Sequence, residues 1–244
     1  MIRIVSYGKG CTCLTISIDW GKIKYYEFTL IQKGFEQMEI TNTLLLMAIG
    51  IPGIIAATTI HEFTRALLST VFGDNYPKSQ KRLTLNPIRH FEPIGFLLMF
   101  YSGGFGWGKP VETSALYYKN RRTQTLLVAI LPSVVNLVLG IVFMGIYVTL
   151  KKSGGNAYLI ALLNYLAYYN VGLALYNCLP VAPMDCVKVL AVMMPANQYF
   201  RYMQNEKMIQ MIFLFLLFFG LITGWMDTLI YGVLNLFGNL LGMA

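Results

Sequence analysis

Long apolar runs of membrane-spanning length are the feature of this sequence that most constrains its fold. Five runs are predicted as spans, at about residues 43–72, 125–150, 156–181, 208–222 and 228–243. A helix rises about 1.5 Å per residue, so roughly 20 apolar residues cross a hydrocarbon core of about 30 Å. Charged residues make up only 12% of the chain, against about a quarter in soluble domains. We therefore predict an all-α, polytopic transmembrane helical bundle of about four to five spans.

Two shorter features lie between these runs. The apolar stretch 94–105 contains Gly103-Gly104 and is too short to cross a bilayer, so a re-entrant or membrane-surface hairpin is predicted there. Between the last two runs, the sequence Gly224-Trp-Met-Asp227 is predicted to form a turn with an interfacial tryptophan.

The first 41 residues differ from the rest of the chain. They mix charges with aromatic residues and short alternating stretches, so we expect a small extramembrane segment, for which a β-hairpin is the candidate structure. They lack the pattern of a cleaved signal peptide, which leaves targeting to the first span. The predicted organisation is an N-terminal segment over residues 1–41 and a transmembrane domain over residues 42–244.

The basic residues predict an orientation, because short cytoplasmic loops carry an excess of Lys and Arg. One group shares a side if the stretch 94–105 turns back, and Lys151 and Lys152 fall opposite. The group comprises Lys78, Lys81, Arg82, Arg89, Lys109, Lys119, Arg121, Arg122, Lys188, Arg201 and Lys207. We expect that side to be cytoplasmic. The N-terminal region would then lie outside despite five basic residues, which Asp19, Glu27, Glu36 and Glu39 nearly balance. The net charge of +8 then reflects topology and attraction to the anionic lipid bilayer, and no nucleic acid partner is expected.

Ionisable residues within apolar spans mark the candidate site, because each costs a few kcal/mol in lipid and usually faces a bundle interior or a cavity. His61, Glu62, Arg65 and Asp185 meet this description. His61 and Arg65 are four residues apart and share a helix face, with Glu62 beside them. The cluster is either a functional site or a set of polar groups that only holds helices together.

Several motifs, in order, give the chain a family resemblance. These are the sequence His-Glu-Phe-Thr-Arg at 61–65, Gly73-Asp74, the stretches 83–95 and 106–111, and the Asn-bearing stretches 131–136 and 177–186. Together they resemble the site-2 protease family of intramembrane zinc metalloproteases, over about residue 42 to the end. That family carries His-Glu-x-x-His and a later aspartate ligand.

The resemblance implies roles for the matched residues. The family cleaves transmembrane helices with a zinc-bound water, so the resemblance makes His61 and Asp185 metal ligands and Glu62 the catalytic general base. It also makes Asn136 and Asn177 candidates to bind unwound substrate backbone.

The chain departs from this pattern at the positions that would bind the metal. Arg65 occupies the place of the second histidine, and a guanidinium has no lone pair for zinc. Cys186 follows Asp185 where the family has glycine, and Ile130 and Leu131 replace small residues. His90 and Cys186 are the only sensible substitute ligands, so we expect zinc binding to be weak or absent.

Two functions follow from these observations. The favoured one is a protease-dead relative that binds the transmembrane helix of a partner or substrate membrane protein, and the alternative is an active intramembrane metalloprotease with unusual ligands. A small transporter has only the intramembrane charges in its support. The expected location is the bacterial cell membrane. If metal is absent, Arg65 is predicted to balance the carboxylates of Glu62 and Asp185.

Overall fold

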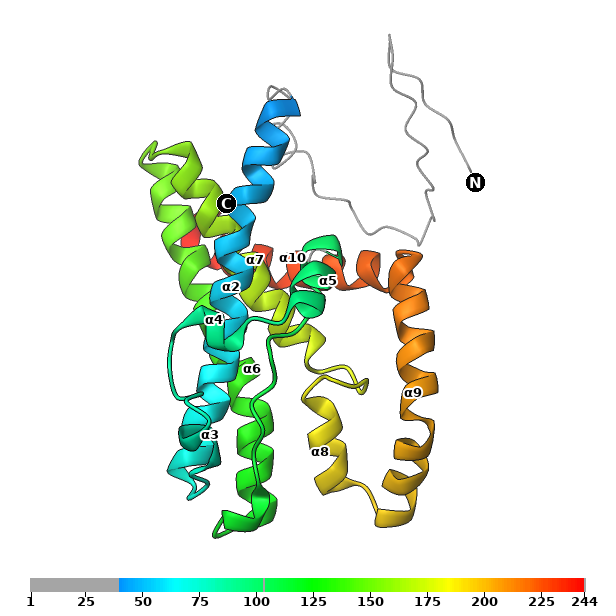
Figure 1. Ribbon diagram of the computed structural model, residues 1–244. Coiled ribbons are helices and arrows are strands. Elements are labelled where there is room, and N and C mark those ends of the chain that lie inside the picture. Colours follow the sequence, from blue (N-terminus) through cyan, green and yellow to red (C-terminus); the bar gives the residue numbers. More distant parts are fainter. Residues whose placement is uncertain (1–39, 103, 244) are drawn as a thin grey trace. The chain divides into compact units, whose positions relative to one another are not determined.

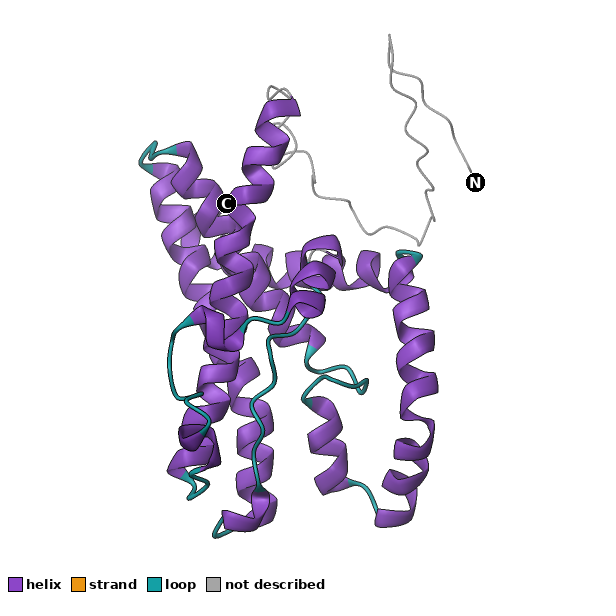
Figure 2. Cartoon of the chain, viewed as in Figure 1, coloured by secondary structure: helices purple, strands orange, loops and turns teal. Residues whose placement is uncertain are grey.

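A computed structural model describes residues 40–102 and 104–243, and the chain is helical throughout its regular elements, with no strand in these two ranges (Figures 1 and 2). Residues from Leu44 onward form one compact unit. The all-α fold predicted from the apolar runs is confirmed. The predicted N-terminal hairpin lies outside the described residues, and the boundary at residue 42 stays a prediction.

The helices follow one another along the chain with short connections. They are α2 (Ile40–Val71), α3 (Tyr76–Ser79), α4 (Pro87–His90), α5 (Pro93–Ser102), the 3₁₀ turn η1 (Ala115–Tyr117), α6 (Arg121–Lys152), α7 (Ala157–Tyr176), α8 (Cys186–Met193), α9 (Ala196–Phe218), α10 (Leu221–Gly238) and the π-helical end η2 (Asn239–Met243).

Helices α6 and α7 form an antiparallel pair (Figure 1); α10 packs against both, α8 packs against α6, and α9 packs against α10 and α8. Gly140 of α6 allows the close approach, because a Cβ there would lie 2.6 Å from the side chain of Val171 in α7. Helix α2 is joined to α6 by a buried hydrogen bond of 3.0 Å from Asn136 Nδ2 to Ala57 O. The side chains packed between these helices are mostly apolar, so the buried ionisable side chains of α2 are exceptions in the interior.

Helices α6 and α7 are long and apolar enough to cross a membrane. Helices α9 and α10 qualify together as a third span, bent by 75° at their junction. The described residues thus hold two to three such candidates by length and composition, which supports a multi-pass membrane protein. The count of four to five spans stays a prediction.

The turn predicted at Gly224–Asp227 is wrong, because these residues lie within α10. The chain breaks earlier, at Gly220, which adopts the left-handed conformation with φ of 75°. Glycine takes this conformation without steric cost, and helices commonly end on such a residue. The signal for the break was therefore Gly220 and not the Gly-Trp-Met-Asp sequence.

Within the predicted stretch, Pro93–Ser102 forms a short apolar helix, α5, after which the chain reverses and returns beside it. Ser102 Oγ accepts a hydrogen bond of 2.7 Å from Phe105 N at the reversal. The two arms meet at glycines: a Cβ on Gly95 would lie 2.0 Å from Trp107 O, and one on Gly106 would lie 2.2 Å from Gly95 O. The chain reverses in the predicted stretch, while the location of this hairpin within or on the membrane stays a prediction. Only glycine fits at these two contacts.

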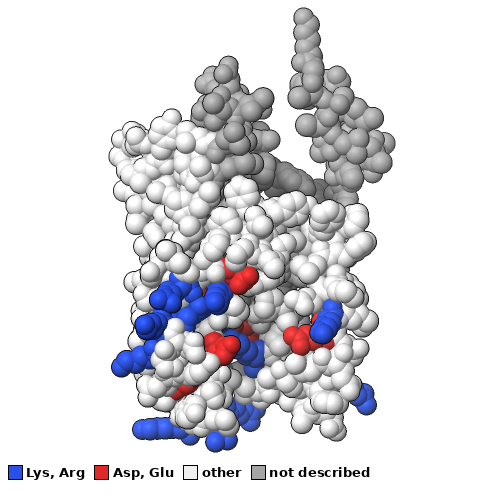
Figure 3. Space-filling model, viewed as in Figure 1, with Lys and Arg blue, Asp and Glu red and all other residues white. Residues whose placement is uncertain are grey.

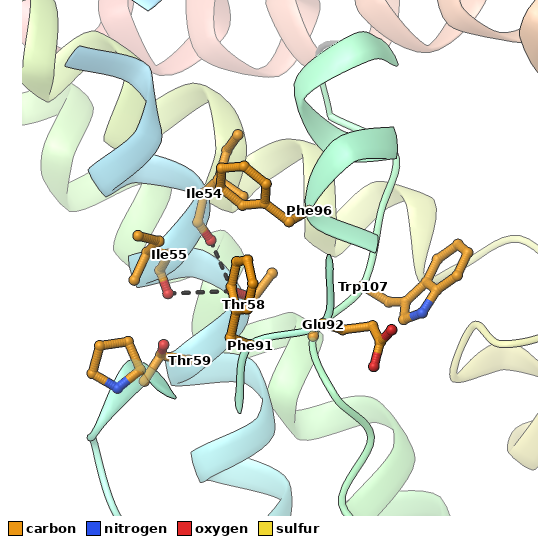
Figure 4. A pocket seen from close by; sticks show the side chains of 10 residues that line it. Ile54, Ile55, Thr58, Thr59, Phe91, Glu92, Phe96 and Trp107 are labelled. Atoms are coloured by element: carbon orange, nitrogen blue, oxygen red, sulfur yellow. Dashed lines mark hydrogen bonds between the residues drawn. The ribbon is translucent and has the colours of Figure 1, made fainter. Parts of the chain in front are cut away.

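The returning arm then runs along α2 and so leads to the candidate site. Gly108 lies against the side chains of Thr58 and Glu62, where a Cβ would approach to 3.3 and 3.2 Å. Figure 4 shows a cavity between α2 and the hairpin, with Phe91, Phe96 and Trp107 on the hairpin side. Thr58 in its wall donates to Ile54 O over 2.9 Å, so its hydroxyl is satisfied within α2.

Candidate functional site

The structure brings His61, Glu62, Arg65 and Asp185 together in the interior. The first three lie on the second half of α2, and Asp185 immediately precedes α8. Each is only 2–3% exposed to solvent. Four ionisable side chains withdrawn from water must satisfy one another, because an unpaired buried charge costs several kcal/mol.

Arg65 lies at the centre of this cluster. Its Nη1 donates to both Oε1 and Oε2 of Glu62 at 2.9 Å, and its Nη2 donates to Asp185 Oδ1. The planar guanidinium thus binds both carboxylates at once, which a lysine ammonium could not do with the same geometry.

His61 completes the cluster through its Nε2 atom. This atom lies 2.9 Å from Asp185 Oδ2 and 3.1 Å from Arg65 Nη2. It can donate to the carboxylate or accept from the guanidinium, but one nitrogen cannot do both. The imidazole Nδ1 is buried and has no hydrogen-bond partner among the described residues.

Lys188 is a member of the site that the sequence prediction missed. Its Nζ lies 3.4 Å from Asp185 Oδ1, and its side chain is 38% exposed. The available signal was its spacing, three residues after Asp185 at the start of a short helix. With Lys188 included, two cationic side chains face two carboxylates.

Glu62 has a further partner on the returning arm of the hairpin. Its Oε2 accepts a hydrogen bond of 2.8 Å from Val111 N. The same arm is fastened on either side by charged side chains from the loop after α2, since Arg82 donates to Lys109 O and Asp74 Oδ2 accepts from Ser114 N at 2.8 Å. Glu62 therefore anchors this arm together with Arg82, Asp74 and the backbone bond of 2.7 Å from Lys109 N to His90 O.

The two predicted asparagines lie in the same region and bond to the protein itself. Asn177 Oδ1 accepts from Asp185 N at 3.2 Å, while Asn177 Nδ2 donates to Leu173 O at 2.8 Å. Asn177 therefore positions the backbone of Asp185. Asn136 bonds to α2 as described above, and its buried Oδ1 lacks a partner within residues 40–102 and 104–243. Their predicted contact with a substrate backbone stays a prediction.

The substitute ligands do not complete a metal site. His90 donates through Nε2 to Thr84 O at 2.7 Å, and burial lowers the pKa of its imidazole. Cys186 is a free cysteine whose backbone N donates to Asn177 O at 3.1 Å. Within the described part of the chain, no three His, Cys, Asp or Glu side chains are grouped so as to hold a metal ion.

The residues present do not fit zinc. A zinc site of this type takes three protein ligands and leaves the fourth position for water. Here the lone pairs of Glu62 and Asp185 face a guanidinium, which brings its own positive charge to the place where the cation would bind. The arrangement is a neutralised ion cluster and lacks an open coordination position.

A small cavity lies beside the cluster. His61, Glu62 and Arg65 form one wall, and the remaining lining is mostly apolar. It consists of Trp107, Gly108, Pro110, Leu173, Asn177 and Pro183. These residues come from the hairpin arm, the end of α7 and the loop before α8, so with α2 four parts of the chain meet at this point.

The comparisons with known proteins agree with a metalloprotease origin. The chain is 33% identical over 181 residues to a Bacillus subtilis (strain 168) protein named "Putative zinc metalloprotease YwhC", and the match covers 71% of this chain and 81% of that protein. No protein-family model matches the chain, and no solved structure does. The chain therefore belongs to the zinc metalloprotease family of this relative.

Proposed function

We propose that this protein is a non-proteolytic member of the site-2 class of zinc metalloproteases, and that it binds the transmembrane helix of a partner membrane protein. The observation that carries the proposal is the position of the Arg65 guanidinium, which hydrogen-bonds to Glu62 and Asp185 and lies 3.1 Å from His61 Nε2. These are the three side chains that metal-dependent hydrolysis would require.

The hydrogen bonds of Glu62 support the loss of catalysis independently. A general base must accept a proton from a water held beside it. Glu62 instead accepts two hydrogen bonds from Arg65 and one from Val111 N.

The partner follows from the membrane domain. The family resemblance assigns transmembrane helices as substrates, and helices α6 and α7 are long and apolar enough to cross the membrane in which such a partner lies. Binding without cleavage is the function that remains when the site loses a zinc-binding side chain and the rest of the membrane domain is kept.

Metal content tests the proposal directly. We expect the purified protein to contain well below one equivalent of zinc by elemental analysis, and we expect Arg65→His to raise the zinc content because it restores a lone pair at the second ligand position. His61→Ala in the Arg65→His background is the control and should remove the added zinc. Stoichiometric zinc in the wild-type protein that depends on His61 and Asp185 would favour the active metalloprotease instead.

A further inference from the structure

The charges of the buried cluster balance without a metal. Glu62 and Asp185 supply two negative charges, and Arg65 and Lys188 supply two positive charges. Three of these side chains are at most 4% exposed, so water screens their interactions poorly. Removing any one of them leaves an uncompensated charge in the interior.

The cluster also joins parts of the chain that are distant in sequence. Arg65 links α2 to Asp185, which is 120 residues away, and Glu62 links α2 to the hairpin arm through Val111 N. Asn177 ties Asp185 to the end of α7. A single guanidinium thus lies at the junction of α2, the hairpin arm and the loop that precedes α8.

We propose, on the basis of the function proposed above, that Arg65 is a permanent internal cation that takes over the structural role of the metal ion and locks these three parts of the chain together. A divalent ion would hold the same junction by coordinating His61 and Asp185. The guanidinium holds it through Nη1, which donates to both oxygens of Glu62, and through Nη2, which donates to Asp185 Oδ1. Its charge does not depend on pH or metal supply. We call this arrangement the Arg65 charge lock.

A double-mutant cycle between Arg65 and Glu62 tests the charge lock. We expect Arg65→Ala to lower the thermal unfolding midpoint of the detergent-solubilised protein by roughly 10 °C, because it leaves two buried carboxylates with one lysine. Glu62→Ala should cost a similar amount, because it leaves an excess of positive charge. The double variant keeps Asp185 opposite Lys188, so its loss should be roughly half the sum of the two single losses.

A control variant and a fallback measurement keep the test decisive. Arg122→Ala removes an exposed arginine at the start of α6 and should change the midpoint by no more than roughly 2 °C. If Arg65→Ala yields no folded protein, the readout becomes recovery: adding Glu62→Ala should restore a folded, monodisperse protein. Failure of the double variant to fold when Glu62→Ala alone folds would overturn the charge lock.

A second readout follows the hairpin arm. Because Arg65 orients Glu62 toward Val111 N, Arg65→Ala should accelerate hydrogen exchange in the peptide that covers residues 106–114, whereas Arg122→Ala should not. Losses that simply add in the cycle, or unchanged exchange in this peptide, would contradict the lock.

The failure of the lock and the failure of the proposed function have different signatures. Zinc bound stoichiometrically by the wild-type protein contradicts the proposed function. Additive losses in a protein that contains no zinc leave the proposed function in place and contradict only the charge lock.

Discussion

At the scale of single residues, the site depends on side chains that hold other side chains in place. Asn177 is the clearest case, because its amide bonds to the backbone of Asp185 and to the last turn of α7. Asp185 N would otherwise be a buried donor near a charged cluster, and a buried donor without a partner costs about 1–3 kcal/mol. Asn177 thereby fixes the position of the aspartate that Arg65 binds.

We expect Asn177→Ala to lower the free energy of unfolding by about 2 kcal/mol, through loss of the bond to Asp185 N. Asn205→Ala is the matched control, since Asn205 Nδ2 makes the same type of bond to Arg201 O four residues earlier, at 2.9 Å, on an exposed surface of α9. Unfolding of both variants in a denaturant series measures the difference. Equal losses would show that Asn177 does no more than an ordinary helix residue.

At the scale of elements, the hairpin of α5 and its returning arm brings the peptide of Val111 to Glu62. The two arms approach so closely at Gly95 that a Cβ would lie 2.0 Å from Trp107 O. Backbone atoms at such a contact cannot move aside without moving the whole arm. The position of the arm, and with it the environment of Glu62, therefore depends on the absence of a side chain at this position.

We expect Gly95→Ala to destabilise the protein by on the order of 3 kcal/mol, because the added methyl group overpacks the contact between the arms. Gly224→Ala is the matched control, since a Cβ there meets nothing within 4 Å and alanine favours a helix over glycine. Unfolding midpoints of the two variants give the comparison. A loss at Gly95 no larger than that at Gly224 would mean that the arms separate easily.

At the scale of the whole molecule, the charges are unevenly placed. On the face drawn in Figure 3, Lys and Arg side chains gather in the lower part, where Figure 1 places α3, α4 and the start of α6, and the part above is almost free of them. Helix α6 connects the two regions over 32 residues, from Arg121 to Lys152, or about 48 Å at 1.5 Å per residue. This length exceeds the roughly 30 Å of a hydrocarbon core.

Single cysteines placed at Arg121 and Lys151, in a background without the four native cysteines, should therefore react with impermeant thiol reagents from opposite sides of the membrane. We expect position 121 to be labelled from the cytoplasmic side and position 151 from the other, because the larger basic group surrounds Arg121. Labelling of both positions from one side would contradict α6 as a span.

Much of this organisation was predictable from local patterns. Apolar runs predicted helices α2, α6 and α7, and Gly103-Gly104 predicted the reversal after α5. Both signals depend only on residues that are neighbours in the sequence. The break between α9 and α10 was misplaced by a few residues, because the turn was predicted at Gly224–Asp227 and the chain breaks at Gly220. The left-handed backbone conformation of Gly220 arises from the chain as folded.

The candidate site was likewise predictable from the sequence only in part. The sequence by itself determined that a cation stands where the family resemblance implies the second ligand, because arginine has no lone pair and keeps its proton in any environment. Only the tertiary structure decided where that cation points. Asp185 lies 120 residues from Arg65, and Val111 lies 49 residues from Glu62. Lys188, in the first turn of α8, pairs with Asp185. Contacts of this range are set by how α2, the hairpin arm and the loop before α8 pack together, and no local spacing along the chain specifies that packing.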